Sequence, residues 1–220
     1  VAHAGANVKL IGAYTGILTG HTGATHQAVQ DTAIMRATPG MRVVDPVDES
    51  ELRSCLRTVI DFEGPVYVRL TRDAWPDVSP PGYRFQFGKA CMLRDGTDLA
   101  IIAGGPLVSE SLKAASELEK RSIRTRVINM SSIKPLDEDA VERAARDCGA
   151  IVVAENHNVY GGLGGAVAEV VCERRPVPVV RVGIKDVLAE SGNNMELLAK
   201  YGMDAPAILK AAERALAMKG

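Results

Sequence analysis

The sequence predicts an α/β fold, in which helices cover both faces of a mainly parallel sheet. Short runs rich in β-branched residues alternate with segments of helical periodicity along the chain, a pattern typical of parallel strands joined by right-handed crossovers. Most runs are apolar throughout, which indicates strands buried on both faces. A segment rich in proline and turn-forming residues, at 75–82, divides the pattern into two parts.

The expected strands are the short apolar runs, because valine and isoleucine favour extended backbone. Each run is too short for an independent helix. They lie at residues 8–11, 41–44, 66–70, 99–103, 125–129, 150–154 and 177–182.

Two of the helices between these strands are marked by apolar residues three or four positions apart. One carries this spacing at Val108, Leu112, Ala115 and Leu118. The other carries it at Val141, Ala144, Ala145 and Cys148. Asp137 or Asp139 stands near the start of the second helix and Gly149 just past its end, as expected of helix caps.

The proline-rich segment predicts a domain boundary, with one unit at residues 1–78 and a second at 83–220. The second unit has enough strands and helices for an independent α/β domain. The first has only three expected strands and two helices, which make a poor free-standing domain. We therefore expect the first unit to complete its sheet with another polypeptide, or to be a fragment of a longer chain.

Composition excludes several classes of protein. The chain has 220 residues, of which 46% are hydrophobic, with 26 basic and 27 acidic residues. This near balance offers no positive field for nucleic acid or for an anionic membrane surface. No apolar run approaches the roughly 20 residues that span a bilayer, and the first residues do not resemble a secretory signal. We expect a cytoplasmic protein.

The four cysteines are far apart and lie in segments with helix or strand patterns. They do not have the spacing of a metal site or of a redox motif. We therefore expect them to be reduced thiols in the core. They are Cys55, Cys91, Cys148 and Cys172.

The most informative segment for function is residues 20–27, which follow the first expected strand and precede a helical pattern. His26 would thus stand near the carboxyl end of a parallel strand, where open α/β sheets bind ligands. A single loop histidine is more often structural than catalytic. Whether His26 is structural or functional therefore depends on evidence from the rest of the chain.

A glycine-rich run at 161–165 follows the expected strand at 150–154. Glycines before a helix can seat a pyrophosphate, but the spacing is not that of the dinucleotide-binding motif. We prefer the interpretation that these glycines allow a tight turn and close packing of the following helix. Neighbouring His157 is expected to lie in a loop or at a subunit interface rather than to act as a base.

A series of segments, in order along nearly the whole chain, resembles the carboxyl-terminal section of transketolases. This section comprises the later part of the pyrimidine-binding domain and the carboxyl-terminal domain, and the likeness is greatest to transketolases made of two separate chains. Deoxyxylulose-phosphate synthases and the thiamine-dependent subunits of 2-oxo acid dehydrogenases share this architecture. The matching segments are 23–27, 34–36, 39–41, 44–46, 48–49, 64–72, 154–165 and 189–192.

The resemblance implies an enzyme that uses thiamine diphosphate, with magnesium or another divalent metal, to transfer a two-carbon ketol unit between sugars. In the family, the cofactor-activating glutamate and the aromatic residues around the aminopyrimidine precede the segment that matches Val1. The diphosphate and metal are held by another domain. We therefore expect a partner bearing that domain, an assembly such as a dimer or heterotetramer, and no catalysis by this chain alone.

The resemblance also assigns roles to individual residues. His26 matches the histidine that exchanges protons with the reacting oxygen, and Arg72 matches the arginine that grips the distal phosphate of the substrate. Three substrate-facing positions depart from the usual pattern: His21 and Thr22 replace an acidic pair, and Tyr14 replaces a histidine. These departures leave a noncatalytic binding or regulatory module as the competing interpretation. A related thiamine-dependent enzyme, of the deoxyxylulose-phosphate synthase or 2-oxo acid dehydrogenase type, is a further alternative.

Overall fold

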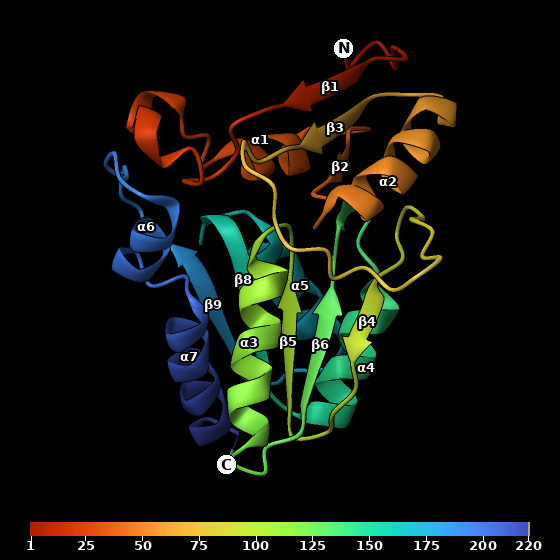
Figure 1. Cartoon of the computed structure of the whole chain (residues 1–220). Coiled ribbons are helices and arrows are strands. Elements are labelled where there is room, and N and C mark those ends of the chain that lie inside the picture. Colours follow the sequence, from red (N-terminus) through yellow and green to blue (C-terminus); the bar gives the residue numbers. More distant parts are fainter. Residues whose placement is uncertain (220) are drawn as a thin grey trace.

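The strands form two separate sheets, which lie one above the other in Figure 1. The computed structural model describes residues 1–219. The four-stranded first sheet has the order β1-β3-β2-β7 and consists of β1 (Lys9–Gly12), β3 (Val66–Arg69), β2 (Arg42–Val44) and β7 (Ser132–Lys134). The five-stranded second sheet has the order β4-β6-β5-β8-β9 and consists of β4 (Cys91–Arg94), β6 (Thr125–Asn129), β5 (Leu99–Ala103), β8 (Ile151–Asn158) and β9 (Val179–Ile184).

Several helices begin at a side chain that caps their first turn. Asp137 accepts a hydrogen bond from the backbone of Ala140 at the start of α4, and Gly149 ends that helix with φ 68°, as its sequence predicts. The α-helices are α1 (Asp31–Ala37), α2 (Glu49–Asp61), α3 (Leu107–Glu119), α4 (Glu138–Cys148), α5 (Leu163–Arg174), α6 (Asn194–Lys200) and α7 (Ala205–Ala217). None of the helices in residues 1–219 is long and apolar enough to cross a membrane.

The second sheet is covered on both faces, with α3 and α7 on one side and α4 and α5 on the other (Figure 1). Successive side chains of a strand point to opposite faces. In β5, Leu99 and Ile101 belong to the core cluster with α3 and α7, whereas Ala100 and Ile102 belong to the cluster with α4 and α5. This two-sided burial explains the unbroken apolar run and confirms the predicted α/β class.

The first sheet contains a strand that the sequence did not predict. β7 comes from the later part of the chain and pairs antiparallel with β2, with Val43 opposite Lys134. The Lys134 ammonium donates to the carbonyl oxygens of Arg36 and Thr38, at 2.7 and 2.8 Å. The first sheet is therefore extended by this chain itself, beyond the three strands expected for it.

Other differences are local. β4 was also not predicted; it pairs antiparallel with β6 at one edge of the second sheet, so both sheets are mixed rather than wholly parallel. β8 continues four residues past the expected end at 154 and reaches Asn158. The expectation that all four cysteines lie in the core is wrong for Cys172, which is exposed on α5, and for Cys91, which is half-buried on β4.

Candidate functional site

The carboxyl ends of two neighbouring parallel strands bring two of the predicted site residues together. β1 pairs with β3 in parallel register, with Gly12 opposite Arg69, so the loops after both strands leave the same edge of the sheet. The first loop carries Tyr14 and the second carries Arg72. The Arg72 guanidinium carbon lies 5.8 Å from the centre of the Tyr14 ring, within the range of a cation–π contact.

The other predicted site residues lie on two short 3₁₀ turns of the loop after β1. We call this loop the substrate loop (residues 14–27), after the role that the sequence predicts for it. His21 and Thr22 belong to the turn Gly20–Thr22, and His26 ends the turn Ala24–His26. All three are exposed. The loop returns beside its own start, because the Ala28 amide donates to the Tyr14 carbonyl oxygen at 3.2 Å. Tyr14 thus lies close in space to the segment that carries His26.

The polar groups of the loop are partly engaged within it. The Thr22 hydroxyl donates to the Thr19 carbonyl oxygen at 2.7 Å and accepts from the Thr19 hydroxyl at 2.8 Å, so one lone pair of its oxygen is left to accept a hydrogen bond from a ligand. Nδ1 of His26 lies 2.9 Å from the Thr25 hydroxyl oxygen. In the described residues no hydrogen bond engages Nε2 of His26, so this nitrogen is available for proton exchange.

The base of the substrate loop is anchored in the core although its tip is exposed. Ile17 and Leu18 are fully buried. The Asn156 side chain of β8 accepts from the Ile17 amide at 3.0 Å and donates to the Thr15 carbonyl oxygen at 3.2 Å. Gly16 has φ 67°, and a β-carbon there would lie 2.0 Å from the Asn156 side chain. The loop therefore presents exposed polar groups from a fixed base.

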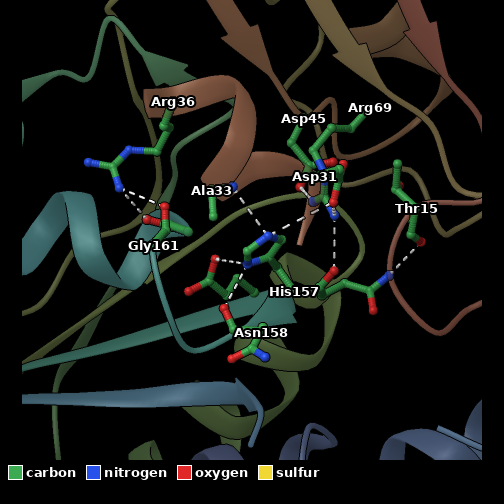
Figure 2. A network of polar contacts seen from close by, with 12 residues as sticks. Thr15, Asp31, Ala33, Arg36, Asp45, Arg69, His157, Asn158 and Gly161 are labelled. Carbon is green, nitrogen blue, oxygen red and sulfur yellow. Dashed lines mark hydrogen bonds and ion pairs between the residues drawn. The ribbon is translucent and has the colours of Figure 1, made fainter. Parts of the chain in front are cut away.

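A buried charge network near the base of this loop joins β3 to α1 and β8 (Figure 2). Arg69 donates to Asp31 at 2.8 Å, to Asp45 at 2.6 Å and to the Asn156 carbonyl oxygen at 3.1 Å. Burial alone would lower the pKa of Arg69, but the carboxylates of Asp45 and Asp31 raise it above its usual value. Although burial opposes ionisation of Asp31, Arg69 holds the pKa of this carboxyl below its usual value. Arg69 therefore stays charged and joins the strand ends to α1.

His157 does not lie in a loop, so that part of the expectation was wrong. It belongs to β8 and is fully buried. Its Nδ1 donates to the Asn158 carbonyl oxygen at 2.6 Å, and its Nε2 accepts from the Ala33 amide at 3.4 Å (Figure 2). Burial, and secondly the charge of Arg69, lower the pKa of His157 to about 4. His157 is thus a neutral link between β8 and α1 at neutral pH.

The glycine-rich run serves the close packing predicted for it. Glu155 accepts hydrogen bonds from the amides of Leu163 and Gly164, at 2.6 and 2.9 Å, at the start of α5. A β-carbon on Gly162 would lie 2.0 Å from the Glu155 carboxylate. This carboxylate occupies the place that a pyrophosphate would need, which argues against the dinucleotide interpretation. Burial raises the pKa of Glu155 to about 7.

The sequence reasoning missed the residues that hold the site in place. Arg69 had a usable signal, since a charged residue within an apolar strand is rarely buried without partners. Asn156 had none, and neither had Asn194, whose Oδ1 accepts from the Gly20 amide at 2.9 Å, because these contacts join residues more than a hundred positions apart.

The residues of this chain do not by themselves fit the metal-bound diphosphate that the sequence resemblance implies. Residues 1–219 contain no group of three or more His, Cys, Asp or Glu side chains that could hold a metal ion. A divalent metal that bridges a diphosphate prefers carboxylate and other oxygen ligands. What this chain presents is the exposed substrate loop and Arg72 at the carboxyl edge of the first sheet.

The fold and the candidate site define an α/β protein in which the loops that carry the predicted site residues leave the carboxyl ends of parallel strands. The family model for the pyrimidine-binding domain of transketolase matches residues 1–77, and the model for the transketolase carboxyl-terminal domain matches residues 88–208. The chain belongs to the transketolase family, whose members depend on thiamine diphosphate.

Several relatives are similar over nearly the whole of this chain. The 6-deoxy-6-sulfo-D-fructose transketolase subunit SqwH of Clostridium sp. strain MSTE9 is 44% identical over 212 residues, which cover 96% of this chain and 66% of the relative. One chain of the apulose-4-phosphate transketolase of Phocaeicola vulgatus is 42% identical, over 96% of this chain and 68% of the relative. The protein thus spans about two thirds of the length of these relatives.

A solved structure described as a split-gene transketolase, an inactive beta4 tetramer, has the same fold. It matches with a TM-score of 0.94 and 41% identity, over 100% of this chain and 70% of that one. Together with the relatives, it confirms the likeness to the carboxyl-terminal chain of two-chain transketolases.

Proposed function

We propose that this chain forms the carboxyl-terminal part of a thiamine-diphosphate-dependent transketolase, which transfers a two-carbon ketol unit between sugars. A partner chain holds the diphosphate and its divalent metal, in a dimer or heterotetramer, and this chain is inactive alone. The observation that carries the proposal is the anchored substrate loop, which exposes His26 and Thr22 and whose first residue, Tyr14, lies against Arg72. A noncatalytic binding module is the alternative, and the kinetic test below separates the two.

His26 is the proposed catalytic residue. Thiamine diphosphate, held by the partner chain, would supply the electron sink for the reaction. An imidazole nitrogen can accept or donate a proton, and the Thr25 hydroxyl beside Nδ1 restrains the ring. Nε2 of His26 therefore gives a proton to, or takes one from, the sugar oxygen at which negative charge develops.

Arg72 is the proposed binder of the far end of the sugar. The two relatives described above are named for a sulfo sugar and a sugar phosphate, and both kinds of substrate carry a strong anion. A guanidinium binds such oxygens through charge-assisted, paired hydrogen bonds. We therefore propose sugars with a terminal phosphate or sulfonate as the substrate class.

The departures at the substrate loop set the choice among such sugars. Thr22 offers a hydroxyl oxygen rather than a carboxylate, so it binds a substrate hydroxyl more weakly and without added negative charge. His21 and Tyr14 stand on the same loop and are both exposed. The proposed donor therefore differs from the ketose phosphates that an acidic pair would select.

The test uses the chain purified together with the product of an adjacent gene for a diphosphate-binding chain. His26→Ala should lower kcat roughly 10²- to 10⁴-fold, the usual range for a positioned acid or base, without weakening cofactor binding. His3→Ala is the matched control, because His3 is also exposed but lies outside the loop. Turnover by His26→Ala at the rate of the control would remove His26 from this role, and an inactive wild-type assembly would count against the transferase itself.

A further inference from the structure

The side chain of Asn194 connects the two segments that carry the proposed substrate-binding residues. Its Oδ1 accepts a hydrogen bond from the Gly20 amide at 2.9 Å. Its Nδ2 donates to the Leu18 carbonyl oxygen at 3.3 Å and to the Asp73 carboxylate at 2.5 Å. One amide group thus holds the substrate loop on one side and the residue next to Arg72 on the other.

The surroundings of Asn194 leave this contact little freedom. The Gly192 amide donates to the Gly20 carbonyl oxygen at 2.9 Å. A β-carbon on Gly20 would lie 2.2 Å from the Gly192 carbonyl oxygen and 2.9 Å from Oδ1 of Asn194. Leu18 and Leu197 are buried in the same core cluster, beneath this contact. The loop and the start of α6 are therefore packed directly against each other.

The contact requires an amide in particular. Oδ1 must accept from a backbone amide while Nδ2 donates to a carbonyl oxygen and a carboxylate. An aspartate of the same shape has no donor, and its negative charge would face Asp73. A residue that only packed against the loop would not need to be both donor and acceptor.

We propose that Asn194 is a positioning residue that sets the separation between the substrate loop and Arg72, so that one anionic sugar contacts both at once. This inference rests on the proposed function. The turn bonded to Asn194 carries Thr22, and the segment bonded to it carries Arg72, so releasing the amide uncouples the two ends of the binding site. Asn194 itself does not touch the reacting atoms.

The experiment compares Asn194→Ala with Asn193→Ala in the assembled enzyme. Asn193 is a matched control, because its side chain only caps α6 by accepting from the Met195 amide at 2.9 Å. With an anionic acceptor sugar, we expect Asn194→Ala to lower kcat/KM about 10-fold, a loss typical of one or two hydrogen bonds. A short uncharged acceptor such as glycolaldehyde does not reach Arg72. For this acceptor, both variants should have the kcat/KM of the wild type.

A double-mutant cycle with Arg72→Ala separates positioning from loss of stability. If Asn194 acts through Arg72, adding Asn194→Ala to Arg72→Ala should cost little further kcat/KM for the anionic sugar. Hydrogen exchange should also quicken at residues 18–20 in Asn194→Ala, and not in Asn193→Ala.

Equal losses for both acceptors, additive losses in the cycle, or unchanged exchange at residues 18–20 would each overturn the positioning role. A wild-type assembly that transfers nothing to any sugar would instead overturn the proposed function, and the positioning role with it. The two failures are therefore distinguishable.

Discussion

Arg72 is exposed at the carboxyl end of β3 and has only the Tyr14 ring as a charge-related contact among the described residues. Its guanidinium is therefore free to bind an anion. In the assembled enzyme, Arg72→Ala should raise KM for phosphate- or sulfonate-bearing sugars. The expected rise corresponds to a loss of about 1.5–3 kcal/mol of binding free energy, the contribution of a hydrogen bond to a charged group. Steady-state kinetics with charged and uncharged sugars of similar length measures this effect.

Two further variants sharpen that prediction. Arg72→Lys keeps the charge but loses the paired donors, so it should restore binding only in part. Arg84→Ala removes an exposed arginine elsewhere and should leave KM unchanged. A similar rise in KM for uncharged sugars in Arg72→Ala would show that the arginine supports the loop rather than the anion.

The placement of single residues could be predicted only where it follows from the ends of strands. Tyr14 and Arg72 meet because the strands before them are parallel neighbours, and the apolar runs indicated both strands. The role of Asn194 depends on a contact with Gly20, and no local pattern encodes contacts between residues so far apart. The buried position of His157 was missed because β8 continues through polar residues that resemble a loop.

On β8, Glu155 and His157 have pKa values that shift in opposite directions, and their Oε2 and Nδ1 atoms lie 3.8 Å apart. Burial raises the pKa of Glu155 from 4.5 to about 7, so its contribution to stability is full below pH 4.5 and is lost as the pH rises through 7. Burial lowers the pKa of His157 from 6.5 to about 4, so its contribution is full above pH 6.5 and is lost as the pH falls through 4. The two slopes offset each other between pH 4.5 and 6.5.

If either side chain is removed, the dependence of the free energy of unfolding on pH should show the contribution of the other. Relative to the wild type, the free energy of unfolding of Glu155→Gln should rise by about 3 kcal/mol between pH 4 and 6.5, because of this pair only the histidine is left to titrate differently in the folded and unfolded states. In His157→Asn it should fall by a similar amount between pH 4.5 and 7. Urea unfolding across this range measures both slopes, and two variants that parallel the wild type would refute the assignment.

The strands that could not be predicted are the two at sheet edges with antiparallel pairing. β7 has three residues and β4 has four, so neither offers a recognisable alternation. β4 also carries the exposed Met92 and the half-buried Arg94, because an edge strand is not covered on both faces. The central strands were predictable because burial on two faces demands an unbroken apolar run.

At the scale of the whole molecule, the chain should not bind thiamine diphosphate measurably by itself. Residues 1–219 lack a cluster of metal-ligating side chains, and the metal-bound diphosphate supplies the electrostatic part of the affinity. Isothermal titration calorimetry in the presence of magnesium should show heat only when the partner chain is added. Micromolar binding to the chain alone would contradict the partner model and require a site of its own.

The first sheet depends on β7, which follows α3 and β6 along the chain although it pairs with β2. The sheet boundary and the linker at 75–82 therefore do not coincide. During synthesis, β2 can pair with β7 only after much of the second sheet has left the ribosome. Recombination at the linker would exchange the whole second sheet and, with it, strand β7 of the first sheet. The two units therefore have to evolve together.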